Sequence, residues 1–232
     1  MSKRIMITGT GTDVGKTYVA GLVVKKLNQA GKNAAYYKAA MSGNERRADG
    51  RLIPGDALQV KEMAGITQPA EEMCPYLYQA AVSPHLAARM EGAPVEMERV
   101  LEGFDRVCSR YDYVTAEGSG GILCPLRFDE QKILLEDFIK VRRLACLIVA
   151  DAGLGAINGV VLTAEYMKAH GIPARGIILN RYQPDSLMHR DNLAMCQQLT
   201  GLKVVACVKD GDTELDISPQ ALEELYLEEE EE

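Results

Sequence analysis

Short apolar runs alternate along the chain with longer stretches in which apolar residues recur every three to four positions. Leu144–Ala150 is almost wholly apolar, which is typical of a strand buried on both faces of a parallel sheet. Other short runs, weaker where alanine is frequent, have the same strand character. These further predicted strands are Arg4–Thr8, Asn33–Lys38, Tyr111–Ala116, Arg175–Leu179 and Lys203–Cys207.

Helical spacing is found in most of the intervening stretches. Ser83 is a natural N-cap residue, and Pro84 suits the first position of the helix that follows. The predicted helices are Lys16–Gln29, Asp56–Ala64, Ser83–Met90, Val95–Ser109, Ile157–Ala169, Asp185–Leu199 and Pro219–Tyr226. Strands that alternate with helices in this way predict an α/β fold, with a mostly parallel sheet and helices on both faces.

Length and charge narrow the possible classes of protein. A chain of 232 residues with 47% hydrophobic residues suits one domain. We therefore expect one α/β domain over residues 1–227 and a solvated acidic tail over residues 228–232. The net charge is −7, and five of the acidic residues are the terminal glutamates, so the rest of the chain is nearly neutral. This balance argues against a nucleic-acid-binding protein, which needs an excess of Lys and Arg.

Other features of the sequence indicate a cytoplasmic protein. No apolar run reaches the ~18 to 20 residues of a membrane span, and the N-terminus leads into a strand rather than a signal peptide. The six cysteines lack CxxC spacing, so reduced thiols are favoured over a zinc site or disulfides. The three histidines are dispersed, which favours capping or surface roles over catalysis.

The strongest motif lies between the first predicted strand and the first predicted helix. Gly9–Thr17 reads GTGTDVGKT, a phosphate-binding loop with five residues between its outer glycines instead of the usual four. Backbone N–H groups and the helix N-terminus would hold the phosphates of a nucleoside triphosphate there. Lys16 would reach the β- and γ-phosphates, and the hydroxyl of Thr17 would bind Mg²⁺.

Charged residues that follow other strands could complete a phosphoryl-transfer site, because ligands bind at the carboxyl ends of parallel strands. Lys38 would stabilise a transferred phosphoryl group, although a solvated surface lysine is the alternative. Asp56 and Glu117 would hold Mg²⁺ together with Thr17. Asp56 could instead cap its helix, and Glu117 could lie exposed in the glycine-rich turn Glu117–Gly121.

Two more strand ends are candidates for ligand contacts. The glycine turn Asp151–Asn158 precedes a helix and could bind an anion such as a substrate carboxylate. An ordinary strand-to-helix turn explains it as well. Asn180 could form a hydrogen bond with a nucleobase, or it could simply be a turn asparagine.

Taken together, these motifs resemble the dethiobiotin synthetase family over roughly the first three quarters of the chain. The resemblance rests on their order and spacing rather than on one of them. The motifs that carry it are the loop at Gly9–Thr17, YK-x-x-x-SG at Tyr37–Gly43, Asp56, Ser83-Pro84-His85, EG-x-GG at Glu117–Gly121 followed by Pro125-Leu126, and LGxIN at Leu154–Asn158.

The resemblance implies a P-loop NTPase-like fold and a ligase that converts 7,8-diaminononanoate, CO₂ and ATP into dethiobiotin, ADP and phosphate. The reaction would pass through a carbamate and a carbamic–phosphoric anhydride, with Mg²⁺ as cofactor. Family members are homodimers in which the substrate tail reaches the neighbouring subunit.

The resemblance also implies the role of each matching residue. Catalytic roles would fall to Lys16, Lys38 and Thr12, and Mg²⁺ would be held by Thr17, Asp56 and Glu117. Asn180 would contact the adenine. The nucleotide would further contact Asp13, Val14, Gly15, Lys16, Thr17, Tyr18, Gly118, Ser119 and Gly120. The diamine and its carbamate would contact Thr12, Lys38 and Ser42, and the substrate carboxylate would contact Gly155, Ala156, Ile157 and Asn158 across the dimer interface.

Departures from the family pattern concern base recognition. The chain reads Ala206-Cys207-Val208-Lys209-Asp210 where the family often has a Glu-Ile-Pro type of segment, and Ala39 follows Lys38 where proline is common. The strictness of the preference for ATP therefore stays open.

Two other classes of protein are alternatives. Amidoligases of the cobyrinic acid diamide synthase type share a related fold but carry an additional glutaminase domain, for which this chain has no room. ParA-like ATPase switches typically have a second lysine early in the phosphate loop, and none lies between Gly9 and Gly15. ATP turnover that requires the diamine and bicarbonate would separate a synthetase from a switch.

Overall fold

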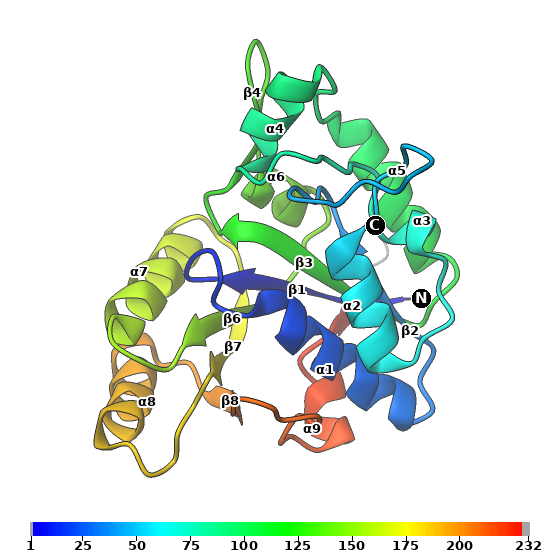
Figure 1. Cartoon of the computed structure of the whole chain (residues 1–232). Coiled ribbons are helices and arrows are strands. Elements are labelled where there is room, and N and C mark those ends of the chain that lie inside the picture. Colours follow the sequence, from blue (N-terminus) through cyan, green and yellow to red (C-terminus); the bar gives the residue numbers. More distant parts are fainter. Residues whose placement is uncertain (1, 229–232) are drawn as a thin grey trace.

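A computed structural model describes residues 2–228, which fold around a central seven-stranded sheet (Figure 1). The order β2-β3-β1-β6-β7-β8 is parallel throughout, and a short β9 pairs antiparallel with the start of β1. The predicted α/β fold with a mostly parallel sheet is confirmed. The strands of this sheet are β1 (Lys3–Gly9), β2 (Ala34–Lys38), β3 (Tyr113–Gly121), β6 (Cys146–Asp151), β7 (Ala174–Asn180), β8 (Val204–Val208) and β9 (Leu227–Glu228).

Helices cover both faces of the sheet, and a small hairpin of β4 (Pro125–Phe128) and β5 (Lys132–Leu134) lies apart from it. Each predicted helix is present, with ends that differ by a few residues. The helices are α1 (Lys16–Gln29), α2 (Gly55–Ala64), α3 (Ala70–Met73), α4 (Pro84–Glu91), α5 (Met97–Cys108), α6 (Leu135–Val141), α7 (Ala156–Ala169), α8 (Leu187–Thr200) and α9 (Pro219–Glu223).

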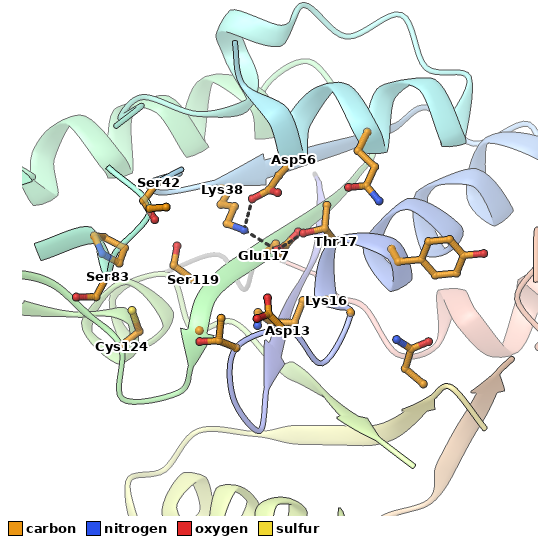
Figure 2. A pocket seen from close by; sticks show the side chains of 18 of the residues that line it. Asp13, Lys16, Thr17, Lys38, Ser42, Asp56, Ser83, Glu117, Ser119 and Cys124 are labelled. Carbon is orange, nitrogen blue, oxygen red and sulfur yellow. Dashed lines mark hydrogen bonds and ion pairs between the residues drawn. The ribbon is translucent and has the colours of Figure 1, made fainter. Parts of the chain in front are cut away.

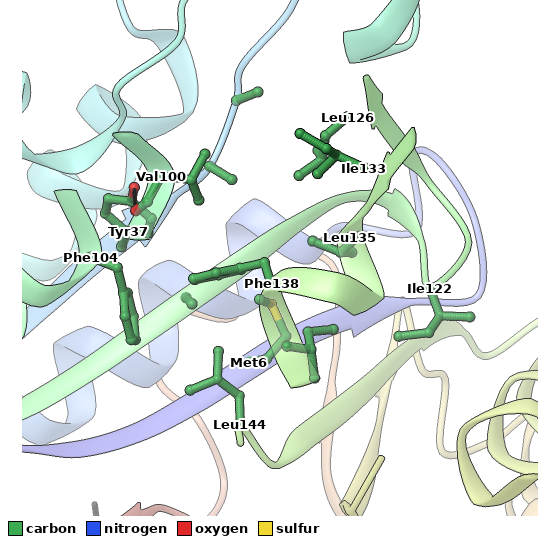
Figure 3. Packing of buried hydrophobic residues seen from close by; sticks show 14 of the residues in the cluster. Met6, Tyr37, Val100, Phe104, Ile122, Leu126, Ile133, Leu135, Phe138 and Leu144 are labelled. Carbon is green, nitrogen blue, oxygen red and sulfur yellow. Dashed lines mark hydrogen bonds between the residues drawn. The ribbon is translucent and has the colours of Figure 1, made fainter. Parts of the chain in front are cut away.

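Two hydrophobic clusters pack on opposite faces of β1, because successive side chains of a strand alternate. Met6 packs on one face with Phe104 of α5 and Phe138 of α6, whose ring centroids lie 5.2 Å apart (Figure 3). Ile5 and Ile7 pack on the other face with residues of α1, α2 and α9. Burial on both faces explains why the central strands are nearly continuous apolar runs.

The third strand is longer than predicted, which changes the position of Glu117. β3 does not end at Ala116 but continues to Gly121. Glu117 pairs in register with Ile7 of β1 and Lys38 of β2, so it lies inside the sheet. The prediction that this strand ends at Ala116 was therefore wrong, and so was the alternative of an exposed glutamate in a flexible turn, because Glu117 is buried and pairs with both neighbouring strands.

Several short elements were not predicted, namely α3, the β4–β5 hairpin, α6 and β9. Each is short, so none shows enough periods of a helix or strand pattern to be recognised. Glu228, expected to begin a solvated tail, instead pairs with Lys3, and the two side chains form an ion pair at 3.1 Å. The other tail residues, 229–232, lie outside the described residues.

Two further observations bear on the sequence predictions. Within residues 2–228, no helix combines the length and the apolar character needed to cross a membrane. All six cysteines are free thiols, as the spacing predicted.

Candidate active site

A cavity of about 1110 Å³ opens at the carboxyl ends of the central strands. The loop after β1, the ends of β2, β3 and β7, and the start of α2 contribute side chains to it (Figure 2). Parallel strands bring their carboxyl ends to one edge, so residues far apart in sequence meet here. This is the edge at which the sequence predicted a phosphoryl-transfer site.

The phosphate loop connects β1 to α1 and folds into a compact turn. The ammonium group of Lys16 is buried and donates a hydrogen bond of 2.8 Å to the carbonyl of Gly11. Gly15 has φ 87°, and a Cβ there would lie 2.0 Å from Asn180 Nδ2, so only glycine fits. Asn180 Nδ2 in turn donates to the carbonyl of Val14 at 3.0 Å. The end of β7 therefore supports the phosphate loop.

Lys38, Asp56, Glu117 and Thr17 form a connected polar cluster beside this loop (Figure 2). Lys38 Nζ lies 2.6 Å from Asp56 Oδ2 and 2.6 Å from Glu117 Oε1. The Thr17 hydroxyl donates to the same Glu117 oxygen at 2.9 Å. Lys38 is 6% exposed, so the alternative of a solvated surface lysine is wrong. Asp56 does not cap α2, since the N-cap residue is Pro54.

Burial and neighbouring charges act in opposite directions on the two lysines. Burial lowers the pKa of Lys38, but the carboxylates of Glu117 and Asp56 raise it more, so its pKa lies above the usual value. Burial lowers the pKa of Lys16 below its usual value, although the charge of Glu117 acts against this. Both ammonium groups therefore face the cavity with their charge balanced mainly by Glu117.

Tyr36 is a site residue that the sequence analysis missed. Its buried hydroxyl donates to Glu117 Oε2 at 2.7 Å, so both oxygens of that carboxylate are engaged. Burial, and then the charge of Glu117, raise the pKa of Tyr36 well above its usual value. The signal was present in the sequence, because Tyr36 and Lys38 are two residues apart in one strand and so share a face.

Most of the predicted site residues line the cavity. These are Thr12, Asp13, Gly15, Lys16, Thr17, Tyr18, Lys38, Ser42, Asp56, Glu117, Ser119, Gly120 and Asn180. Val14 and Gly118 are not among the lining residues, and a Cβ on Gly118 would lie 2.5 Å from Leu135 Cδ2. The absence of a side chain there lets Leu135 of α6 pack closely against β3. Gly155, Ala156, Ile157 and Asn158 lie at the start of α7, also outside the cavity lining.

Other lining residues were not predicted to belong to the site. Ser83, which the structure confirms as the N-cap residue of α4, lines the same end of the cavity as Ser42 (Figure 2). Cys124 also lines the cavity, and burial raises the pKa of its thiol to about 11. The remaining unpredicted lining residues are Ala40, Gln59, Ala81, Val82, Pro84, Arg181, Lys209, Asp210 and Gly211.

The oxygen atoms of this cluster fit a magnesium ion. Mg²⁺ prefers carboxylate and hydroxyl oxygens and keeps several of its waters. Thr17, Asp56 and Glu117 supply such oxygens, and the Lys38 ammonium between the two carboxylates shows that a positive charge is accommodated there. Residues 2–228 contain no group of three or more His, Cys, Asp or Glu side chains placed to hold a metal, so an ion here would depend on water and phosphate oxygens as well.

Comparison with known proteins gives a consistent result. A family model described as an AAA domain matches residues 3–213. The ATP-dependent dethiobiotin synthetase BioD of Brachyspira hyodysenteriae is 46% identical over 93% of this chain and 96% of that protein. A synthetase of the same name from Clostridium botulinum is 42% identical over 98% of this chain and 100% of that protein.

Solved structures are similar in fold at low sequence identity. A chain of the MinC:MinD cell division protein complex of Aquifex aeolicus superposes with a TM-score of 0.58 at 13% identity, covering 97% of this chain and 94% of that chain. The match supports the P-loop NTPase-like fold. Sequence identity over nearly the full length is the stronger evidence, and it shows that this chain belongs to the ATP-dependent dethiobiotin synthetase family.

Proposed function

We propose that this chain carries out dethiobiotin synthesis, a step of biotin biosynthesis, in the cavity between the phosphate loop and the Lys38 cluster. The substrates would be 7,8-diaminononanoate, CO₂ and ATP, and the products dethiobiotin, ADP and phosphate. Family membership over nearly the full chain supports the overall reaction. The observation that carries the assignment to this site is the position of Lys38 between Asp56 and Glu117, beside the phosphate loop.

The reaction has three steps. One substrate amine takes up CO₂ and loses a proton, which gives a carbamate. A carbamate oxygen then attacks the γ-phosphorus of ATP and ADP leaves, which gives a carbamic–phosphoric anhydride. Finally the second amine attacks the carbonyl carbon and loses a proton, phosphate leaves and the ureido ring closes. The transferred group is anionic throughout, so the main requirement is positive charge at fixed positions.

The residues that line the cavity are suited to these steps. Lys16 and the N–H groups of the phosphate loop would hold the β- and γ-phosphates. Lys38 would stabilise both the carbamate and the phosphoryl group during its transfer. Thr12 and Ser42 would position the carbamate and the diamine. Mg²⁺ on Thr17, Asp56 and Glu117 would supply further positive charge to the phosphates. Asn180 keeps an unused oxygen after donating to Val14, and this acceptor would suit the amino group of adenine.

The substrate carboxylate would be bound by a second copy of the chain. Gly155–Asn158 lie outside the cavity lining of their own subunit, which supports a role at the cavity of a neighbouring subunit. Beside them, Leu154 is 96% exposed and Leu162 of α7 is 63% exposed, an apolar surface that a homodimer would cover. A two-fold dimer would place each turn at the cavity of its neighbour.

Phosphate release tests the function directly. We expect release from ATP, Mg²⁺ and bicarbonate only when 7,8-diaminononanoate is present, with a product of the mass of dethiobiotin. In Lys38→Ala release should fall by a factor on the order of 10² or more, because a charge that acts in the transition state is lost. Lys168→Ala is the matched control, since Lys168 is exposed on α7. Equal ATP turnover without the diamine would instead indicate a switch ATPase.

A further inference from the structure

A second charged cluster adjoins the phosphate loop on the side opposite Lys38. Arg181 follows Asn180 at the end of β7, and Asp151 ends the neighbouring strand β6. Arg181 Nη1 donates to Asp151 Oδ2 at 2.7 Å, and Arg181 Nη2 donates to the carbonyl of Asp13 at 3.0 Å. The roles proposed above assign no function to this arginine, although it lines the same cavity.

The backbone at both ends of the Arg181–Asp13 contact is unusual. Among residues 2–228, the non-glycine residues with positive φ are Asp13 (59°), Arg143 (48°) and Arg181 (54°). The side chain of one of them, Arg181, donates a hydrogen bond to the backbone carbonyl of another, Asp13. Such conformations cost free energy and persist where the surrounding contacts enforce them, often at functional sites.

The contact determines which way a peptide group of the loop faces. In a trans peptide the carbonyl of one residue and the N–H of the next point in opposite directions. Arg181 binds the Asp13 carbonyl, so the N–H of Val14 points away from Arg181. Asn180 does the same for the next peptide, because it binds the Val14 carbonyl. Consecutive N–H groups that face the same way form an anion-binding concavity.

Asp151 holds the arginine in place. Its Oδ2 accepts from Arg181, while its Oδ1 accepts from the N–H of Gly153 at 2.8 Å. Burial raises the pKa of the Asp151 carboxyl, but the hydrogen bonds from Arg181 and Gly153 lower it more, so the pKa lies below its usual value. Asn192 of α8 fixes the same turn by donating to the carbonyls of Ala152 and Gly153.

From this geometry we propose that Arg181, held by Asp151, is a positioning residue for nucleotide binding that orients the Asp13–Val14 peptide toward the phosphates. The proposal rests on nucleotide binding at the phosphate loop, as proposed above. It assigns Arg181 an effect on ATP affinity rather than on the chemical step. Removal of the guanidinium frees the Asp13 carbonyl, and the loop then has to be ordered by the nucleotide itself, which weakens binding.

The test measures the Kd of Mg-ATP by calorimetry, together with KM and kcat. In Arg181→Gln we expect the Kd and the KM for ATP to rise about tenfold while kcat changes less than twofold, since the charge-assisted hydrogen bond to the Asp13 carbonyl is lost. Asp151→Asn should raise the Kd by a smaller factor. The double variant should match Arg181→Gln, because both changes act through one contact. Arg181→Lys should recover only part of the affinity, since it cannot reach both partners.

The matched control is Arg175→Gln, an exposed arginine at the opposite end of β7, which should leave the Kd unchanged. If Arg181→Gln is too unstable to assay, Arg181→Lys and Asp151→Asn carry the same test. An ATP affinity equal to the wild type in these variants, or effects that add in the double variant, would overturn the proposal. Failure of the proposed function would look different, since the wild type would then hydrolyse ATP without the diamine.

Discussion

Glu117 is the residue on which most polar contacts of the site converge. It is 1% exposed, and its two oxygens accept from Lys38, Thr17 and Tyr36. A buried carboxylate is stable only when such partners compensate for its lost hydration. Each partner therefore restricts the orientation of Glu117, and with it the position of any cation bound there.

Replacement of Tyr36 by Phe tests whether the orientation of Glu117 matters for the metal. Loss of the hydrogen bond to Oε2 should raise the Mg²⁺ concentration needed for half-maximal activity, on the order of tenfold, because the carboxylate is held less firmly. We also expect the free energy of unfolding to fall by about 1–3 kcal/mol. A Mg²⁺ titration of activity and a urea titration without metal measure the two effects separately.

Tyr37→Phe is the matched control for Tyr36→Phe. The Tyr37 hydroxyl is also buried, but it donates to the carbonyl of Val100 on the opposite face of the sheet (Figure 3). This variant should lose comparable stability and keep its Mg²⁺ dependence. An equal shift in the Mg²⁺ dependence of both variants would show that the change is a general effect of lost stability.

At the scale of elements, helix α1 joins the two ends of the cavity. It begins at the phosphate loop, and Tyr18, Lys25 and Gln29 all reach the segment Asp212–Glu214. Residues with this spacing fall on one face of a helix. The Tyr18 hydroxyl donates to the carbonyl of Asp212, directly after the Lys209–Gly211 lining. The same helix therefore supports both the phosphate loop and the lining segment after β8.

Tyr18→Phe should loosen the loop after β8 without disturbing the phosphate loop. We expect the KM for ATP to rise about threefold to tenfold with little change in kcat, since one hydrogen bond to the loop is lost. Discrimination between ATP and other nucleoside triphosphates should also decrease. Gln29→Ala removes the contact farthest from the cavity and serves as the control, for which KM should remain that of the wild type. A KM for ATP unchanged in Tyr18→Phe would contradict this role.

The sequence predicted individual helices and strands correctly where the hydrophobic pattern extends over many residues. The strand Leu144–Ala150 and the helix Lys16–Gln29 were predicted because several periods of one pattern are visible in each. The hairpin Pro125–Leu134 and helix α6 were not, since they are short and follow one another without a glycine or proline break. β3 was predicted too short, because its glycine-rich end is kept in the sheet by the pairing of Gly121 with Gly9 of β1 rather than by local preference.

Some residues of the site could likewise be predicted from the sequence, and others could not. Residues at strand ends, such as Lys38 and Asn180, could be predicted because topology brings those ends together. Arg181 follows the recognised Asn180 directly, yet whether such a neighbour faces the cavity depends on backbone angles that the pattern does not specify. Arg181, for example, faces the cavity from a left-handed conformation.

At the scale of the whole molecule, buried cysteine thiols and a buried tyrosine hydroxyl, which stay protonated in the folded state, make the stability of the fold sensitive to high pH. Burial raises the pKa of Cys74 from 9.0 to about 12, and burial raises the pKa of Cys146 and Tyr226 above their usual values. A raised pKa contributes stability that is fully present below the pKa of the unfolded chain. It is lost as the pH rises toward the pKa of the folded state.

The contribution of the two thiols to the free energy of unfolding should therefore fall above about pH 9, and that of the Tyr226 hydroxyl above about pH 10, each by about 1.4 kcal/mol per pH unit. Urea unfolding at intervals between pH 7 and pH 11 measures this slope. Cys74→Ala should be less stable at pH 7, because a buried side chain is shortened, but its stability should fall less steeply above pH 9. A slope equal to that of the wild type would show that the Cys74 thiol does not contribute.

The proposed homodimer can be tested by mixing two inactive variants. Lys38→Ala damages the cavity of its own subunit, whereas Asn158→Asp places a negative charge in the turn that would bind the substrate carboxylate for the neighbouring subunit. In a mixed dimer, one site carries both changes and the other carries neither. If subunits exchange at random, half of the dimers are mixed and on the order of a quarter of the wild-type activity returns.

The two possible arrangements predict opposite results in this experiment. If Gly155–Asn158 served the cavity of their own chain, every site in a mixed dimer would carry one change and activity would stay near that of the separate variants. A titration of one variant against the other should give a maximum at equal amounts, which instability of either variant does not produce. Lys168→Ala mixed with Lys38→Ala is the control, because there each Lys168→Ala subunit keeps an intact site whatever its partner. Recovery in the first mixture therefore requires both a dimer and a shared site, since neither alone restores activity.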